Sequence, residues 1–245
     1  MKVVFLGATK GIGRSLARLM AERGDRLLLL GRDPRELERS AKDLEVRGAP
    51  PPVHVLSCDL AKPETFAETL DKSERLLGGL ETVVVTAGIF ATQETLETDS
   101  SLTGQVLTID FTNTVLFCEE VRRRLVAIGG GTLCVFSSVA GDRGRKPGIL
   151  YGASKAGLSH YLEGLDHKFR AAGLKTICVK PGFVKTGMTA GLKPPPFAGE
   201  PDAVAKTVLK AIDRGKPVVY APPIWRWIMF VIRYLPRFVM RKIKF

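Results

Sequence analysis

Short, continuously apolar runs alternate with longer helical patterns along most of the chain. Seven of these runs read as strands that are buried on both faces of a sheet: residues 3–6, 26–30, 53–57, 82–86, 132–136, 176–179 and 218–220. The intervening stretches have the apolar spacing of helices: residues 12–23, 34–47, 63–77, 102–128, 149–171 and 201–214. Because repeated strand–helix–strand units favour parallel pairing, the pattern predicts an α/β fold with a doubly wound, mostly parallel seven-stranded sheet and helices on both faces.

The chain is long enough to bury a sizeable core without disulfides or metals. Its 245 residues, of which 25% are charged, fall in the ordinary range for one globular domain or at most two. Neither an internal repeat nor a linker interrupts the pattern. We therefore expect residues 1–220 to form a single domain and residues 221–245 to form a C-terminal tail.

The excess of positive charge is concentrated near the C-terminus. The formal net charge is +12, and residues 214–245 contain eight basic side chains and no acidic one. Aromatic residues are interleaved with arginine and lysine there, which is typical of a basic amphipathic helix lying in an anionic membrane interface, and Pro236 is expected to kink or divide it. The alternative is a C-terminal helix that packs on its own domain or in an oligomer interface. Nucleic-acid binding is not expected, because no reading motif accompanies the cluster and its apolar content is high.

Cysteine and histidine usage predicts neither a disulfide nor a metal site. The four cysteines lie singly in apolar stretches, as buried thiols in a reducing compartment do, and the three histidines lack zinc-ligand spacing. A strand pattern rather than a signal peptide begins the chain, and the longest apolar run in the tail falls far short of the ~20 residues of a spanning helix. The expected location is cytoplasmic, at the inner face of the membrane if the tail binds lipid.

A glycine-rich turn joins the first expected strand to the first expected helix. Its spacing is Gly-x-x-x-Gly-x-Gly, in which glycine lets the backbone approach a pyrophosphate and the helix N-terminus supplies unpaired N–H groups. In this context the turn predicts dinucleotide binding rather than a plain tight turn. The residues expected to bind the cofactor here are Gly7, Thr9, Lys10, Gly11, Ile12 and Gly13.

Arg32 follows the second expected strand at the position that selects between nicotinamide cofactors. A base there binds the 2′-phosphate of NADP, whereas an acid binds the ribose hydroxyl of NAD. Arg32 and Lys10 can both bind a phosphate, so NADPH is the expected cofactor. The adjacent Asp33 argues for NADH, unless it serves as the N-cap of the helix that begins at Pro34.

A serine, a tyrosine and a lysine form the candidate catalytic group. Ser138 follows the fifth expected strand, and Tyr151 and Lys155 are four residues apart on one expected helix, so they share a face. A tyrosine with a pKa near ~10 is a weak acid or base at neutral pH, but a fixed lysine cation lowers that pKa toward the working pH. A serine hydroxyl at the carboxyl end of a strand can hold a substrate carbonyl oxygen.

With these motifs, residues 1 to about 220 resemble the short-chain dehydrogenase/reductase family. The resemblance implies a Rossmann-type catalytic domain, assembled as a homodimer or homotetramer, that transfers a hydride between a nicotinamide and a carbonyl or alcohol carbon. It implies that Tyr151 is the general acid for reduction, that Lys155 binds the nicotinamide ribose and that Ser138 polarises the carbonyl. Further residues at positions where the family contacts the cofactor are Asp59, Ala87, Gly88, Pro181, Gly182, Val184 and Thr186.

Two positions depart from the family pattern. Thr86 replaces the asparagine of the usual Asn-Ala-Gly motif, and a hydroxyl can make some of the amide's hydrogen bonds. Asp110 stands where the family often has an asparagine that holds a water of the proton relay, and the nearest asparagine is Asn113. A carboxylate accepts hydrogen bonds but donates none unless it is protonated. Either Asp110 serves the relay in altered form, or Asn113 compensates, or the relay runs differently, or turnover is slow.

Within that family, residues 137–145, residues 187–190 and the end of the chain resemble the reductases of decaprenylphosphoryl-2-keto-ribose and their bacterial relatives. The resemblance implies NADPH-dependent reduction of a lipid-linked keto-sugar or another amphiphilic ketone, a substrate that a tail at the membrane surface would suit. A broad carbonyl or 3-ketoacyl reductase is one alternative, and a non-catalytic NADP-sensing protein is another. The intact Ser138, Tyr151 and Lys155 argue against the sensor.

Overall fold

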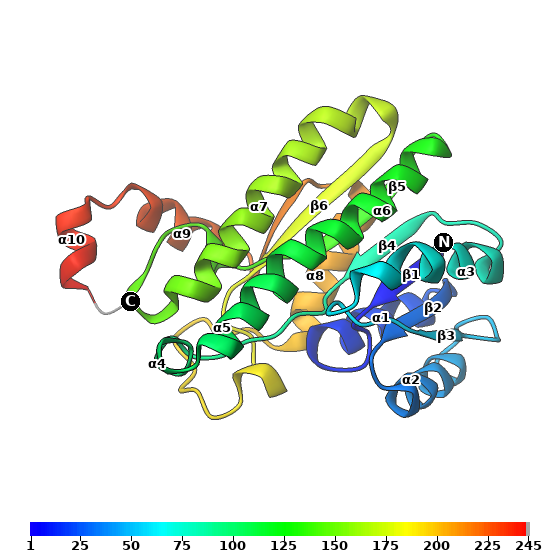
Figure 1. Cartoon of the computed structure of the whole chain (residues 1–245), viewed down its shortest axis with the longest axis horizontal. Helices are drawn as coiled ribbons and strands as arrows, with labels where there is room; N and C mark the ends of the chain where they lie inside the picture. Colours follow the sequence, from blue (N-terminus) through cyan, green and yellow to red (C-terminus); the bar gives the residue numbers. More distant parts are fainter. Residues whose placement is uncertain (244–245) are drawn as a thin grey trace.

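Seven parallel strands form the central sheet of the molecule. The computed structural model describes residues 1–243, and its strands are β1 (Lys2–Leu6), β2 (Arg26–Gly31), β3 (His54–Ser57), β4 (Thr82–Val85), β5 (Gly131–Phe136), β6 (Leu174–Pro181) and β7 (Val218–Ala221). Their order is β3-β2-β1-β4-β5-β6-β7, and each neighbouring pair is parallel (Figure 1). The predicted doubly wound sheet of the Rossmann type is confirmed, and all carboxyl ends of its strands lie at one edge.

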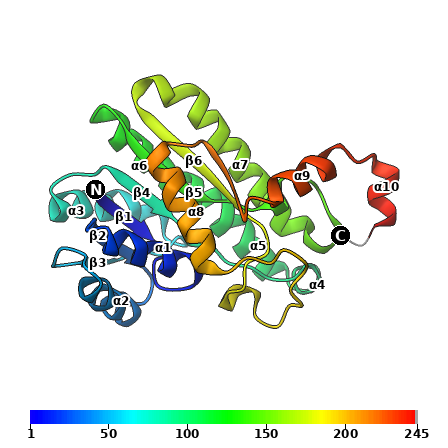
Figure 2. The same ribbon diagram turned by 180° about the vertical axis from the view of Figure 1, so that it is seen from behind.

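Helices cover both faces of this sheet, as Figures 1 and 2 show from opposite sides. One face carries α1 (Gly11–Glu22), α2 (Pro34–Val46) and α8 (Pro201–Arg214). The other face carries α3 (Phe66–Leu77), α6 (Thr114–Ala127) and α7 (Ile149–Phe169). Four shorter helices complete the described part of the chain: α4 (Gln93–Thr98), α5 (Ser100–Leu107), α9 (Trp225–Tyr234) and α10 (Arg237–Lys242).

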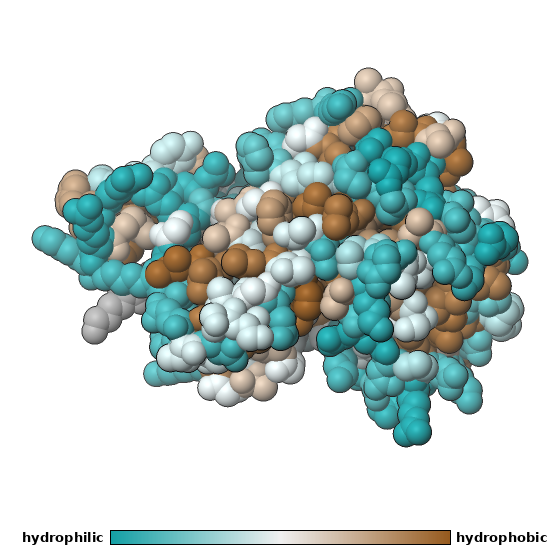
Figure 3. All heavy atoms as spheres, viewed as in Figure 1, coloured by the Kyte–Doolittle hydropathy of each residue, from teal (hydrophilic) through white to brown (hydrophobic). Residues whose placement is uncertain are grey.

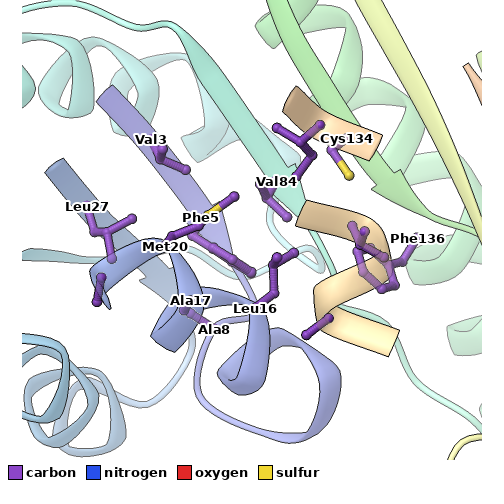
Figure 4. Close-up of a cluster of buried hydrophobic side chains, with 14 of the residues drawn as sticks. Val3, Phe5, Ala8, Leu16, Ala17, Met20, Leu27, Val84, Cys134 and Phe136 are labelled. Atoms are coloured by element: carbon purple, nitrogen blue, oxygen red, sulfur yellow. The ribbon is translucent and has the colours of Figure 1, made fainter. Parts of the chain in front are cut away.

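Each face of the sheet has its own apolar core. On β1, Val3 and Phe5 point into the core beneath α1, whereas Val4 and Leu6 point into the core beneath α3 and α6. Figure 4 shows part of the first core, in which Phe5 lies among side chains of α1 and of the neighbouring strands. Side chains that point to either face of the sheet are buried. The strands therefore appear in the sequence as continuous apolar runs rather than as alternating apolar and polar residues.

Local signals set several helix ends as predicted. The Asp33 side chain accepts hydrogen bonds from the amides of Arg35 and Glu36 at 3.0 and 3.3 Å, so it is the N-cap of α2. Gly215 ends α8 in the left-handed conformation, with φ at 60°. Pro236 divides the tail, because α9 ends at Tyr234 and α10 begins at Arg237.

The helix predicted over residues 102–128 is present, but it is not a regular α-helix throughout. Its α-helical parts, α5 and α6, are joined by a π-helical turn (Thr108–Asn113), which was not predicted. The Thr114 hydroxyl donates to the Ile109 carbonyl oxygen at 2.7 Å and so competes for an acceptor of the helical hydrogen-bond ladder. Such π-turns often occur at functional sites, and this one holds Asp110 and Asn113 buried. The helix α4 was not predicted either, since six residues are too few for a periodic signal.

The tail packs on the domain through one side of α9. Trp225, Met229 and Ile232 are buried in a small apolar cluster with Val139, and both α9 and α10 lie at one end of the molecule (Figures 1 and 2). Within residues 1–243, no helix is both long enough and apolar enough to cross a membrane.

Phe117 tests the core beneath α6. Its ring is fully buried and meets the Phe66 ring edge-on at a centroid distance of 5.3 Å. We expect Phe117→Ala to lower the free energy of unfolding by about 3–5 kcal/mol, because the lost contacts leave a cavity. Urea unfolding measures the change. The control Val46→Ala removes a side chain that is 90% exposed and should change the free energy by less than about 0.5 kcal/mol. Equal unfolding midpoints for Phe117→Ala and wild type would contradict this account of the core.

Candidate active site

The glycine turn between β1 and α1 leaves no room for side chains at two of its positions. A Cβ on Gly13 would lie 2.2 Å from the Gly7 carbonyl oxygen, and a Cβ on Gly7 would lie 2.6 Å from the Ala87 amide nitrogen. Thr9, Lys10 and Ile12 lie in the turn and the start of α1, whose first turn has no capping side chain and no acidic residue. Free N–H groups at a helix N-terminus beside a close-packed glycine turn fit a pyrophosphate.

Thr86 connects the end of β4 to this turn. Its hydroxyl donates to the Gly7 carbonyl oxygen at 2.8 Å. A Cβ on Gly13 would also lie 2.6 Å from the Thr86 hydroxyl oxygen. The threonine that departs from the family motif therefore has a structural role, which is to hold the glycine turn against the neighbouring strand.

Two cations lie at the same edge of the sheet. β2 pairs with β1, so Arg32, which follows β2, emerges beside the turn that holds Lys10. Both residues are exposed, and neither forms a salt bridge within residues 1–243. Asp33 is engaged in capping α2, and the side chain of Asp59, after β3, accepts from the Ala61 amide at 3.0 Å. The edge thus offers two cations to a phosphate group.

The segment after β6 crosses from the end of that strand to the glycine turn. Pro181 ends β6, the buried Val184 pairs with Gly199 in an isolated bridge, and a Cβ on Gly11 would lie 3.3 Å from the Thr186 methyl carbon. These residues therefore bound the space above the turn, where a dinucleotide would lie. Position 182 has to be glycine because of the tail. A Cβ on Gly182 would lie 2.1 Å from the Trp225 ring nitrogen, so the indole fills the space that a side chain would need.

Ser138, Tyr151 and Lys155 come together at this edge. Ser138 follows β5, and its hydroxyl oxygen accepts from the Ala140 amide at 3.1 Å. The Ser138 side chain lies close enough to the Tyr151 phenol to lower the pKa of that phenol. On α7, the Lys155 ammonium lies 5.5 Å from the centre of the Tyr151 ring. The three predicted catalytic groups thus form one constellation beside the residues that follow β4 and β6.

Asp110 joins this group through a buried ion pair with Lys155. Its Oδ2 atom lies 3.2 Å from the Lys155 ammonium nitrogen, and its Oδ1 accepts from the Ile89 amide at 2.8 Å. Gly88 makes room for the pair, because a Cβ there would lie 3.0 Å from Oδ1 of Asp110. Asn113 is directed elsewhere, since its side-chain amide donates to the Leu60 carbonyl oxygen at 2.6 Å. Of the two candidates for the relay position, Asp110 is the one that contacts Lys155.

The ion pair changes the electrostatics expected from tyrosine and lysine alone. Burial raises the pKa of the Tyr151 phenol, the Lys155 cation lowers it, the Asp110 carboxylate raises it, and the net direction is upward. Burial lowers the pKa of Lys155, but Asp110 and Tyr151 more than offset this effect, so that pKa is also raised. Burial raises the pKa of Asp110 against the opposing effect of Lys155. The lowering of the Tyr151 pKa by Lys155 that the sequence predicts is present, but burial and the Asp110 carboxylate outweigh it.

Sequence reasoning missed three residues that contact α7, the helix that carries Tyr151 and Lys155. Gln93 of α4 accepts hydrogen bonds from the amides of Ile149 and Leu150 at 2.8 and 3.2 Å, at the start of α7. The Ser137 hydroxyl donates to the Lys155 carbonyl oxygen at 2.9 Å, and the Phe90 ring meets the Tyr151 ring edge-on at 5.1 Å. Only Ser137 carried a signal, as the neighbour of Ser138 in a serine pair. Gln93 and Phe90 lie in a segment with no motif.

The residues at this edge fit a nicotinamide dinucleotide. The turn supplies free amides to a pyrophosphate, Lys10 and Arg32 supply positive charge, and Tyr151 lies where a proton could be exchanged with a carbonyl or alcohol oxygen. Within residues 1–243, histidine, cysteine, aspartate and glutamate form no group of three that could hold a metal ion.

Known proteins resemble this chain over most of its length. The family model described as short chain dehydrogenase matches residues 1–196. An uncharacterized oxidoreductase of Mycobacterium tuberculosis is 32% identical over 240 residues, which cover 98% of this chain and 96% of that protein. Carbonyl reductase family member 4 of Danio rerio is 31% identical over 222 residues, which cover 87% and 91%. A solved short-chain type dehydrogenase/reductase from Mycobacterium ulcerans has the same fold, with a TM-score of 0.78 at 21% identity over 89% of this chain and 86% of that one.

Asp110→Asn tests the electrostatic role of the carboxylate. Because the Asp110 charge raises the pKa of Tyr151, a neutral amide should lower that pKa, and phenolate should form at lower pH than in wild type. Ultraviolet absorption titration detects the phenolate, and Asp110→Asn/Tyr151→Phe supplies the background from the other tyrosines. An unchanged titration curve would remove Asp110 from the electrostatics of the site.

Proposed function

The chain belongs to the short-chain dehydrogenase/reductase family, and we propose that it reduces a ketone to an alcohol with NADPH. The observation that carries this proposal is the constellation of Ser138, Tyr151 and Lys155 at the carboxyl edge of the sheet, beside the glycine turn. Short-chain dehydrogenases are oxidoreductases that use nicotinamide cofactors, and carbonyl reductases are among the relatives of this chain.

The site residues divide the chemistry of reduction among them. The bound cofactor would supply the hydride that adds to the carbonyl carbon. Ser138 would hold the carbonyl oxygen by a hydrogen bond, and Tyr151 would donate its proton to that oxygen. The raised pKa of Tyr151 keeps the phenol protonated at neutral pH, which is the form that reduction needs. Lys155 would stabilise the phenolate that remains after transfer, and Asp110 holds the lysine in place.

The preference for NADPH rests on charge at the edge of β1 and β2. Lys10 and Arg32 are exposed cations, and the neighbouring acid, Asp33, is engaged as the N-cap of α2. The argument for NADH that Asp33 raises is therefore weak, whereas the two cations suit a 2′-phosphate.

The proposed substrate is a lipid-linked keto-sugar or another amphiphilic ketone. Support comes from the motif resemblance to decaprenylphosphoryl-2-keto-ribose reductases and from the tail, whose Trp225 packs on Gly182 beside the site. A broad carbonyl or 3-ketoacyl reductase is the second candidate, which the similarity to carbonyl reductase family member 4 favours.

A panel of ketones separates these candidates and tests the reaction itself. We expect NADPH oxidation with amphiphilic ketones, and a loss of about 10²–10⁴-fold in kcat for Tyr151→Phe, which keeps the ring but has no proton to give. Absorbance of the reduced nicotinamide measures the rate. Equal activity of Tyr151→Phe and wild type would refute the proposed mechanism, and a clear preference for short water-soluble carbonyls would favour the second candidate.

Arg32→Ala tests the choice of cofactor. Charge-assisted hydrogen bonds contribute roughly 1.5–3 kcal/mol, so loss of the guanidinium should weaken NADPH binding by about tenfold or more and leave NADH binding almost unchanged. Calorimetric titration with each cofactor gives both affinities. Arg35→Ala, which removes another exposed cation a few residues along the chain, should affect neither. Equal losses for NADPH and NADH in Arg32→Ala would contradict the assignment.

A further inference from the structure

The helix α9 has two apolar faces instead of one. Its inner face, with Trp225, Met229 and Ile232, is buried on the domain. The opposite face is also apolar, at the spacing of three and four residues that places side chains on one side of a helix. Its side chains point away from the protein: Trp227 is 64% exposed, Phe230 58%, Val231 59% and Tyr234 75%.

One more exposed aromatic side chain follows the break at Pro236. Phe238 of α10 is 65% exposed. The rings of Phe230 and Tyr234 contact each other at a centroid distance of 5.2 Å. We call Trp227, Phe230, Val231, Tyr234 and Phe238 together the tail surface. Single exposed apolar residues are ordinary on proteins, but a group that shares one face of a helix, as the four residues of α9 do, indicates an interaction site.

Cations surround the tail surface, and no acidic residue accompanies them. Residues 214–245 contain no aspartate or glutamate. The exposed basic side chains of α9 and α10 are Arg226, Arg233, Arg237, Arg241 and Lys242. Within the described part of the chain, none of the five forms a salt bridge. Figure 3 shows hydrophilic and weakly apolar atoms side by side at the end of the molecule where Figure 1 places these helices.

We propose that the tail surface docks on an anionic lipid bilayer. Aromatic side chains beside arginine and lysine suit the boundary between headgroups and acyl chains, and the negative surface potential attracts the cations. The tail lies at one end of the molecule, where it can meet a flat surface (Figures 1 and 2). A second copy of the chain is a poorer occupant, because a two-fold axis at this face would bring the two sets of cations together.

Two hydrogen bonds connect the backbone of the tail to the segment that lies between Ser138 and Tyr151. Arg143 donates to the Leu235 carbonyl oxygen at 3.0 Å, and Lys146 donates to the Arg241 carbonyl oxygen at 2.5 Å. Both donors lie in the segment between Ser138 and Tyr151. Docking would therefore hold the site at a fixed position relative to the bilayer. If the substrate is lipid-linked, which rests on the proposed function, this position would favour its headgroup.

Vesicle binding by the full chain tests the proposal without cofactor or ketone, so its outcome is independent of the catalytic activity. We expect the protein to sediment with phosphatidylcholine vesicles that contain phosphatidylglycerol, and much less with phosphatidylcholine alone or at high salt. Trp227→Ala/Phe230→Ala should weaken binding by at least about tenfold, since affinity scales with the apolar area inserted. Arg226→Glu/Arg237→Glu should weaken it by more than about fivefold per cation.

Matched variants elsewhere on the protein serve as controls. Val46→Ala/Ile128→Ala also removes exposed apolar side chains, and Arg39→Glu/Lys42→Glu makes the same change in net charge on α2, far from the tail. Both should bind as wild type does. Tryptophan fluorescence gives a second readout, because Trp225 is buried and Trp227 exposed. Vesicles should shift the emission to shorter wavelength in wild type, and Trp227→Phe should lose this shift while still sedimenting.

Three results would overturn the proposal. The full chain could fail to bind anionic vesicles, or the tail variants could bind as well as the control variants do. Light scattering could also show a dimer that Trp227→Ala/Phe230→Ala dissociates, which would assign the tail surface to a second copy of the chain. Thermal unfolding of each variant at the wild-type temperature shows that lost binding is not lost folding.

Discussion

A buried ammonium needs an anion, and the ion pair between Lys155 and Asp110 meets this requirement at the centre of the site. Both side chains are almost fully buried, and removing either charge would leave the other unpaired in a region of low dielectric. The surrounding elements are arranged accordingly: the π-helical turn holds Asp110, the Ile89 amide orients it, and Gly88 leaves space for it. The position of the Lys155 ammonium thus depends on two segments that are distant from α7 in sequence.

Much of the fold was predictable, because parallel strands covered on both faces leave an unmistakable apolar pattern. All seven strands and the glycine turn lie where the pattern put them, within one or two residues at most ends. The capping role of Asp33 and the break at Pro236 were predictable for a similar reason, since the geometry of these residue types acts over a few neighbours only. The proximity of Tyr151 and Lys155 follows from the helical repeat alone.

What could not be predicted depends on contacts between distant segments. The π-helical turn shows no break in apolar spacing, and its geometry is supported by the Thr114 hydroxyl and by the partners of Asp110. Gln93 acts on α7 from a helix of six residues, too short to be recognised. The direction of the Tyr151 pKa also required the structure, because it depends first on the burial of the phenol and then on a carboxylate forty-one residues away in the chain. The motifs predict which side chains meet at the site, and the contacts made in the fold set the pKa values of those side chains.

The contact between Trp225 and Gly182 has a consequence for how sequences of this kind can diverge. The indole occupies the space that any side chain at position 182 would need. A larger residue there is compatible only with the loss or displacement of the tryptophan, so the two positions can change freely only together. For the same reason, a chain shortened before Trp225 would not be a neutral deletion. It would expose Val139, which is next to Ser138, and remove the contact of Trp225 with the segment after β6. An effect of such a deletion on activity could then come from the missing tail or from damage to the site.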